Sequence, residues 1–162
     1  MMMSSFTLAE LAQGISADLA KLTTAEQAVT GTAINTDTRT IQAGDVFLAL
    51  RGENFDGHDY LTQAHASGAV AAIVDETYVT ELINSLNLSS ANPSYGSLSV
   101  INESFPLLIV SDTLLALWQA CLWNRQKFTG PLMAITGSAG KTSVKSMAAH
   151  MMEIVGTCWA TP

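Results

Sequence analysis

The apolar positions of the chain fall into short continuous runs and into stripes with helical spacing, separated by polar loops. Thr7 and Glu10 have the spacing of a helix-capping box, and the apolar residues after them share one helical face, which predicts a helix over residues 7–14. Continuous apolar runs at 46–50 and 69–74 predict two buried strands. The helical spacing and the continuous apolar runs together indicate a fold that contains both helices and strands.

The segment between the two strands predicts a loop followed by a helix. Residues 51–59 are rich in glycine and in side chains that hydrogen-bond to their own backbone, a composition that favours a loop. Asp59 is placed to cap a helix from 60 to about 67, and Gly68 can end that helix. The order strand, helix, strand is typical of a parallel α/β unit.

Further elements are predicted beyond residue 80. Residues 84–105 are rich in Ser, Asn and Gly and predict a surface loop, and the apolar run 107–110 predicts a third strand. Ser111 or Asp112 can cap the helix that follows. That helix carries a mostly apolar stripe of residues at helical spacing, which we interpret as part of the hydrophobic core rather than as a binding site. The residues of the stripe are Leu114, Leu117, Trp118, Cys121, Leu122 and Arg125.

A new unit is predicted after the break at residues 129–131. It consists of a strand over 132–136, a glycine-containing loop, and a helix from 141 to about 155. The change of pattern predicts a domain boundary near 110–130.

The loop of this last unit has the parts of a phosphate-binding loop. Gly137 and Gly140 let the backbone approach a phosphate closely, Lys141 supplies a positive charge, and Thr142 supplies a hydroxyl suited to Mg²⁺. The full pattern GxxxxGK[ST] is not met, because Ile135 stands at its first glycine. The predicted strand and helix on either side favour phosphate binding over the alternative, a strand-to-helix turn with an exposed lysine.

A second candidate site is the run Thr-Asp-Thr-Arg at residues 36–39. An arginine fork can bind a phosphate or a carboxylate through two N–H groups, and neighbouring hydroxyls can contact a nucleotide. The alternative is a turn or surface ion pair between Asp37 and Arg39, which composition alone favours. His58 and His65 lack metal-ligand spacing, and we interpret them as a loop hydrogen-bonding residue and a helix-face residue.

Composition limits the classes of function further. The 162 residues allow one domain, or one domain and part of another, and 48% hydrophobic against 13% charged residues indicates a folded protein. The net charge of −7 argues against a nucleic-acid-coating surface or a polybasic membrane patch, so an anionic ligand must be held locally. Cys121 and Cys158 suggest neither a disulfide framework nor a zinc site. Without a secretory signal or a long apolar window, we expect a cytoplasmic protein with no membrane insertion.

Four motifs, taken in order, resemble the Mur ligases of peptidoglycan synthesis. The resemblance covers essentially the whole chain, and its specificity rests on the four motifs together. They are TDTR at 36–39, GDVFLAL at 44–50, GENFDGHDY at 52–60 and ITGSAGKTS at 135–143. Mur ligases also lack the first glycine of the long phosphate-loop pattern, whereas Ala139 stands where they usually have Asn.

The resemblance implies an α/β fold with two parts. Residues 1–110 would form a UDP-muramyl-peptide-binding domain, and residues 111–162 a linker helix and the first strand, phosphate loop and helix of a central ATPase domain. It implies Thr38 and Arg39 as contacts to uridine diphosphate, Lys141 as the catalytic lysine at the outer phosphates, and Thr142 as an Mg²⁺ ligand. The implied ATP-binding set is Gly137, Ser138, Ala139, Gly140, Lys141, Thr142 and Ser143.

The resemblance also implies a reaction. ATP would phosphorylate the terminal carboxylate of UDP-N-acetylmuramoyl-tripeptide, and the amine of D-alanyl-D-alanine would attack the acyl phosphate to form an amide. The rest of the central domain and a C-terminal domain would lie beyond these residues, so the chain alone is expected to be inactive. Two alternatives stay open: the tripeptide-synthesising Mur ligase, which adds a diamino acid, and a non-catalytic nucleotide-binding module. A phosphate-loop kinase or GTPase is a third possibility.

Overall fold

A computed structural model of the chain describes residues 5–85, 105–158 and 160. The chain divides into two units, with the boundary between Lys127 and Phe128, and each unit is described by itself. Most of the predicted loop at 84–105 lies outside the described residues. The assignment of residues 1–110 and 111–162 to two functional domains stays a prediction.

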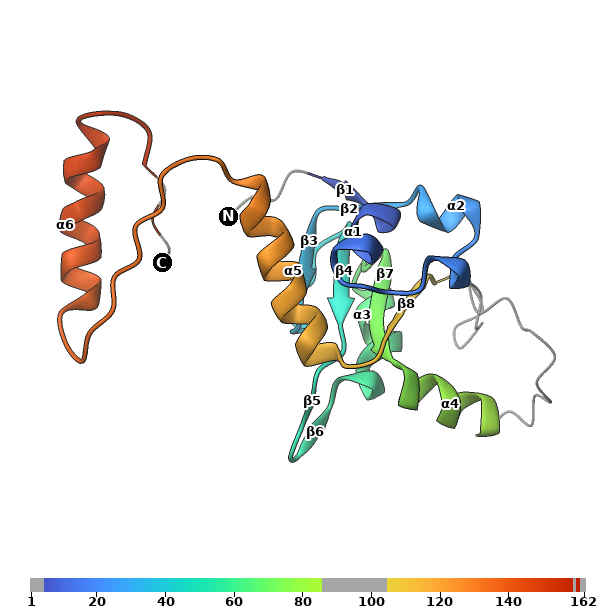
Figure 1. The fold of residues 1–162 in the computed structure, drawn as a ribbon. Helices are drawn as coiled ribbons and strands as arrows, with labels where there is room; N and C mark the ends of the chain where they lie inside the picture. The colour runs from blue at the N-terminus through green and yellow to red at the C-terminus, as the bar shows by residue number, and fades with distance from the viewer. Residues whose placement is uncertain (1–4, 86–104, 159, 161–162) are drawn as a thin grey trace. The chain divides into compact units, whose positions relative to one another are not determined.

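The first unit is built on a four-stranded parallel sheet with the strand order β3-β4-β7-β8 (Figure 1). The three strands predicted within this unit, at 46–50, 69–74 and 107–110, are confirmed as β4, β7 and β8. β3 was not predicted, because Ile34 is its one large apolar residue. The strand bounds are Ala33–Asn35 for β3, Asp45–Leu48 for β4, Ala71–Asp75 for β7 and Leu107–Val110 for β8.

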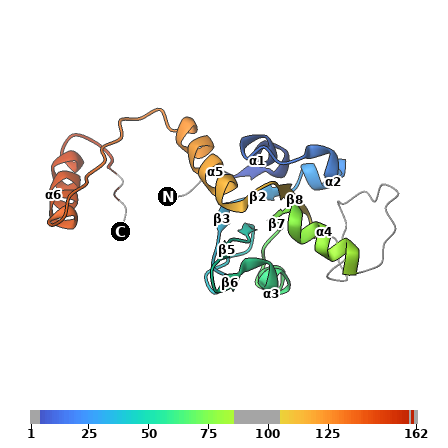
Figure 2. The same ribbon diagram turned by 60° about the horizontal axis from the view of Figure 1, so that its bottom comes forward.

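Helices cover both faces of this sheet (Figure 2). Successive strand residues point to opposite faces, so Val46 and Leu48 pack in one core cluster and Phe47 and Ala49 in the other. The first cluster includes residues of α1 and α5, and the second includes residues of α3 and α4. The helix bounds are Leu8–Gly14 for α1, Leu61–Ala66 for α3, Glu76–Ser85 for α4 and Thr113–Lys127 for α5.

Smaller elements complete the first unit. Two antiparallel pairs, β1 with β2 and β5 with β6, stand apart from the main sheet. Their bounds are Phe6–Thr7 for β1, Thr30–Gly31 for β2, Arg51–Gly52 for β5 and Phe55–Asp56 for β6. The short helices are α2 (Thr24–Gln27) and two 3₁₀ helices, Leu19–Lys21 and Gly57–Tyr60.

Side-chain caps fix where several helices begin. The capping box at α1 is confirmed, because Thr7 and Glu10 hydrogen-bond each other's backbone N–H groups. Asp112 is confirmed as the cap of α5, since its Oδ1 accepts the Leu115 N–H at 2.8 Å. α4 was not predicted, and its first turn is capped by Asp75, the last residue of β7.

The predicted cap of the helix after residue 60 is wrong. Asp59 makes no cap; instead Asp56 accepts the His58 N–H at 2.9 Å and begins the 3₁₀ helix that precedes α3. That early turn requires a close backbone approach, because a Cβ on Gly57 would lie 2.8 Å from the backbone N and O of Leu50. A side chain at residue 57 would therefore push this segment away from Leu50.

The apolar stripe predicted as core on α5 is wrong except at Leu117, which is partly buried against a core cluster. Leu114 and Leu122 are exposed, and Trp118 is 70% exposed. The buried positions are Ala116 and Ala120, together with Thr113, at the same helical spacing on another face. The small side chains of the two alanines pack into the core cluster shared with α1, and Leu117 and Trp123 lie partly buried against the same cluster. The Trp123 ring meets Phe6 edge to face, with centroids 5.6 Å apart.

The second unit contains one described helix, α6 (Lys141–Glu153), close to the predicted bounds. The predicted strand at 132–136 does not form, because a β-strand needs a neighbouring strand for its hydrogen bonds and none of the described strands pairs with this segment. No residue of α6 is buried. This unit therefore lacks a core of its own among its described residues.

Candidate functional site

The carboxyl ends of the parallel strands meet at one edge of the sheet, and a pocket lies there. The loop after β3 carries residues 36–39, and the segment after β4 carries the hairpin β5–β6 and the 3₁₀ helix. Together they enclose about 470 Å³. We call this the Arg39 pocket; its lining residues are Thr36, Asp37, Thr38, Arg39, Phe47, Phe55, Tyr60 and Gln63.

Arg39 is held in a two-pronged ion pair on the rim of the pocket. Its Nε and Nη2 lie 2.9 and 2.6 Å from the Oδ1 and Oδ2 of Asp37, yet its side chain is 83% exposed. Hydrogen bonds from the Arg39 side chain and backbone N–H lower the pKa of Asp37 to about 2. The ion pair between Asp37 and Arg39, which the sequence suggested as the alternative to a binding site, is therefore present. Nη1 has no partner among the described residues, so the guanidinium retains donors for an anion.

Two aromatic side chains form another part of the pocket lining. Phe55 and Tyr60 stack with ring centroids 5.4 Å apart and an angle of 27° between the rings, and both remain partly exposed. An exposed aromatic face can stack on a planar ring such as a nucleobase. Sequence reasoning assigned neither residue to the site, because two aromatics in a glycine-rich loop give no signal until the fold places them beside Arg39.

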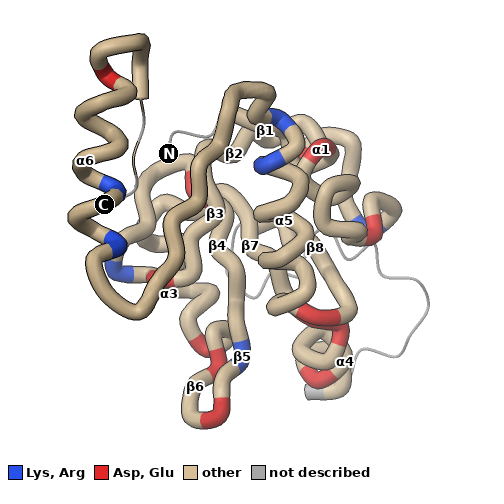
Figure 3. Tube along the Cα trace, turned by 60° about the vertical axis from the view of Figure 1, so that its left-hand side comes forward, with Lys and Arg blue, Asp and Glu red and all other residues tan. Residues whose placement is uncertain are grey.

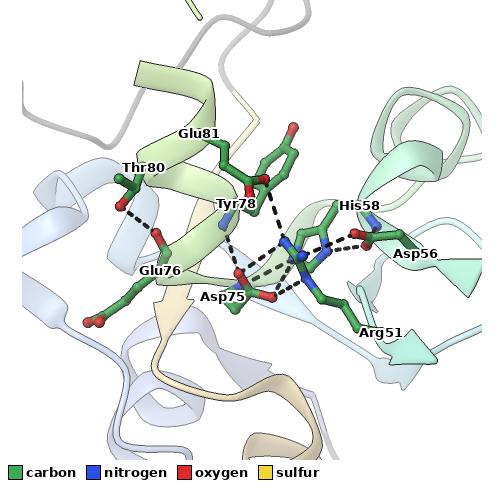
Figure 4. A network of polar contacts seen from close by, with 8 residues as sticks. All are labelled: Arg51, Asp56, His58, Asp75, Glu76, Tyr78, Thr80 and Glu81. Carbon is green, nitrogen blue, oxygen red and sulfur yellow. Dashed lines mark hydrogen bonds and ion pairs between the residues drawn. The ribbon is translucent and has the colours of Figure 1, made fainter. Parts of the chain in front are cut away.

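A polar network lies next to the pocket, where the hairpin meets the end of β7 (Figure 4). Arg51 donates from Nε to Asp75 at 2.8 Å, and His58 bonds to both Asp56 and Asp75. The prediction that His58 is a loop hydrogen-bonding residue is confirmed. Figure 3 shows acidic residues gathered on the same hairpin and on α4, so Arg51 is surrounded by carboxylates.

The glycine loop of the second unit leads directly into α6. Gly140 has φ +77°, a left-handed conformation that favours glycine, and it is the N-cap of α6. The Lys141 side chain curls back and donates from Nζ to the Gly137 carbonyl, which closes the loop. Thr142 and Ser143 lie exposed in the first turn of α6, where backbone N–H groups are free of helical partners.

Other candidate residues have structural roles. His65 contacts Phe105 ring to ring at 4.7 Å, and His150 bonds to the Ser146 carbonyl. The described residues contain no cluster of three or more His, Cys, Asp and Glu side chains that could hold a metal, and no helix among them has the length and apolarity to cross a membrane.

Comparison with known proteins agrees with the motifs. Residues 30–103 match the Mur ligase family, catalytic domain. The chain is 37% identical over 128 residues to the UDP-N-acetylmuramoyl-tripeptide–D-alanyl-D-alanine ligase of Synechocystis sp., and 38% identical over 128 residues to that of Escherichia coli. Each match covers 79% of this chain, but only 24% and 23% of the relatives, so the chain spans about a quarter of their length.

A solved structure supports the same relationship. It is the structure of UDP-N-acetylmuramoylalanyl-D-glutamyl-2,6-diaminopimelate–D-alanyl-D-alanyl ligase from Acinetobacter baumannii, with a TM-score of 0.66 and 29% identity. The match covers 94% of this chain and 29% of that one. The α/β fold with its parallel four-stranded sheet thus matches part of a larger ligase. The chain belongs to the Mur ligase family, and within that family it is similar to the D-alanyl-D-alanine ligases, MurF.

Proposed function

We propose that the chain forms the UDP-substrate-binding domain and the first part of the ATPase domain of a ligase that adds D-alanyl-D-alanine to UDP-N-acetylmuramoyl-tripeptide. The observation that carries this proposal is the Arg39 pocket, which combines an exposed guanidinium with a stacked aromatic pair at the carboxyl edge of the sheet. The similarity to D-alanyl-D-alanine ligases supports this substrate over a diamino acid.

The chemistry of the pocket suits uridine diphosphate. Arg39 and the Thr38 hydroxyl would bind the diphosphate, and the exposed faces of Phe55 and Tyr60 would stack on the planar uracil. A local positive group matters here, because the net charge of −7 repels anions elsewhere. We expect the muramyl peptide to extend from the pocket toward parts of the enzyme outside these residues.

The glycine loop suits the phosphates of ATP. Gly137, Ser138, Ala139 and Gly140 would present backbone N–H groups, as would the first turn of α6, and Lys141 would stabilise charge on the outer phosphates. The exposed Thr142 hydroxyl, with Ser143 beside it, fits one position of an Mg²⁺ ion that also binds phosphate oxygens. Bound ATP would supply the phosphoryl group that activates the substrate carboxylate as an acyl phosphate, and Mg²⁺ would neutralise charge on the phosphates.

The proposed enzyme works in the cytoplasm on small-molecule substrates. Because the chain spans about a quarter of its relatives, we expect it to bind both nucleotides but not to join D-alanyl-D-alanine to the muramyl tripeptide without the remaining central and C-terminal domains. The amide would form when the amine of D-alanyl-D-alanine attacks the acyl phosphate and releases phosphate, leaving ADP from the first step. The role of these residues is to bind and orient.

Isothermal titration of the 162-residue chain with UDP-N-acetylmuramoyl-tripeptide, and separately with ATP and Mg²⁺, tests the proposal. Arg39→Ala should raise the Kd for the muramyl nucleotide by about tenfold or more, since charge-assisted hydrogen bonds contribute about 1.5–3 kcal/mol. Lys141→Ala should weaken the binding of ATP and leave the affinity for the muramyl nucleotide unchanged. Lys127→Ala, which removes a charge outside both sites, is the matched control. Absence of muramyl-nucleotide binding by the unmodified chain would refute the proposal.

A further inference from the structure

The hairpin β5–β6 carries Phe55 to the Arg39 pocket, but little apolar packing holds it in place. Arg51, Gly52, Glu53 and Phe55 are all exposed, and the strands of the hairpin are two residues each. A hairpin this short is marginally stable on its own. Contacts other than the core must therefore fix where the aromatic lining of the pocket lies.

Arg51 provides one set of these contacts. Its Nε and Nη2 lie 2.8 and 3.4 Å from the Oδ2 and Oδ1 of Asp75, and its Nη1 lies 3.4 Å from Asp56 Oδ2 (Figure 4). Glu81 lies 3.9 Å from Nη2. Partial burial acts to lower the pKa of Arg51, but the hydrogen bond to Asp75 and the charges of Asp75, Asp56 and Glu81 together outweigh it and raise the pKa. One guanidinium thus joins the hairpin to the end of β7.

His58 provides the second set. Its Nε2 accepts the Asp75 backbone N–H at 3.2 Å, so Nε2 carries no hydrogen and Nδ1–H donates to Asp56 Oδ1 at 2.6 Å. The ring is buried and stacks on Tyr78 with centroids 4.6 Å apart. Burial acts to raise the pKa of the Asp56 carboxyl, but the hydrogen bonds from His58, together with the electrostatic interactions with His58 and Arg51, outweigh burial and lower that pKa. The imidazole therefore links the 3₁₀ helix to the sheet.

Asp75 connects Arg51 and His58 to the sheet. It is a buried residue at the end of a fully buried strand, and its Oδ1 also accepts the Tyr78 N–H at 2.8 Å. No buried side-chain polar atom in the described part of the chain lacks a partner, so the network is fully satisfied. None of Arg51, His58 and Asp75 lines the Arg39 pocket.

We infer that Arg51, His58 and Asp75 are positioning residues, which hold Phe55 and Tyr60 in the geometry that binds the uracil of the nucleotide substrate. The ligand in this statement rests on the proposed function. The network sets the affinity for uridine nucleotides because it removes the freedom of the hairpin before the ligand binds.

Two variants test this inference in the 162-residue chain, with uridine diphosphate as the probe. Asp75→Asn puts an amide donor beside the Arg51 donors, and Arg51→Lys keeps the charge but loses the fork. Each variant should lower the affinity for uridine diphosphate by about tenfold, while the affinity for ATP at the glycine loop stays unchanged. Glu53→Gln is the matched control, because Glu53 lies in the turn of the same hairpin and makes no ion pair with any described residue.

Amide hydrogen exchange without ligand separates failure of the inference from failure of the proposed function. In both variants the amides of residues 52–60 should exchange faster, while those of β4 keep their wild-type rates. Unchanged exchange in this segment would overturn the inference whatever happens to binding, and so would unchanged affinity for a wild-type chain that binds the probe. If the wild-type chain binds no uridine diphosphate but the segment loosens, the proposed ligand is wrong and the positioning role of the network stands.

Discussion

The carboxylate of Asp37 and the guanidinium of Arg39 are two residues apart and share a turn. Their pairing lowers the pKa of Asp37 from the ordinary 3.8 to about 2, through the side-chain and backbone hydrogen bonds of Arg39. Because the folded-state pKa is the lower one, the contribution of the pair is fully present above pH 3.8 and is lost as pH falls toward 2. The exposed position keeps this contribution small.

We predict that the Asp37 carboxyl titrates with a midpoint near pH 2 when its ¹³C chemical shift is followed by NMR. In Arg39→Ala the midpoint should return toward 3.8, because the hydrogen bonds that favour the charged form are gone. Asp59, an exposed carboxylate outside the pair, serves as an internal reference. A midpoint of Asp37 that does not move in the variant would contradict the assignment of the ion pair.

Which residues share a site could be predicted only in part. TDTR suggested an arginine fork, and the fold brings Thr38 and Arg39 to one pocket. Phe55 was not assigned to that pocket, because its place depends on how the hairpin folds back, which no local pattern specifies. Asp59 was predicted as a helix cap, but Asp56 is the residue that begins the 3₁₀ helix, next to the close backbone approach at Gly57.

At the scale of elements, two local signals predicted their elements correctly, whereas the cap expected at Asp59 did not form. The capping box at α1 and the strand at 107–110 formed as predicted, because hydrogen bonds over three residues and a continuous apolar run determine them. The strand at 132–136 depends on a partner strand, and the exposed stripe of α5 depends on which helix face meets the sheet. Both depend on tertiary contacts that periodicity does not specify.

We predict that the capping box of α1 contributes measurably to the stability of the first unit. Thr7→Ala removes the acceptor for the Glu10 N–H and should lower the free energy of unfolding of the first unit by about 1 kcal/mol, with little loss of packing. Urea denaturation followed by circular dichroism measures the change. Thr24→Ala, an exposed first residue of α2, should cost less than half as much. Equal losses in the two variants would show that the box contributes nothing specific.

At the scale of the whole molecule, the two units differ in what stabilises them. The first has core clusters on both faces of its sheet, whereas α6 buries none of its residues. Val144, Met147 and Met151 of that helix are exposed at helical spacing. Isolated helices shorter than about 12–15 residues are marginal in water, and tertiary packing supplies most helix stability in proteins. The 13 residues of α6 therefore have little to hold them in a helix.

We predict that native-state hydrogen exchange of the 162-residue chain separates the two units. Amides of α6 should exchange by local opening, with protection at least about a hundredfold below that of β4 and β7, which open only with the core. α5 is the matched control within the molecule, because it is a helix of similar length that buries Ala116 and Ala120. If α6 were as protected as β4, contacts of α6 with another surface, such as a second copy of the chain, would be required, and dilution would then lower the protection. Persistence of that protection on dilution would contradict the conclusion that α6 lacks a core.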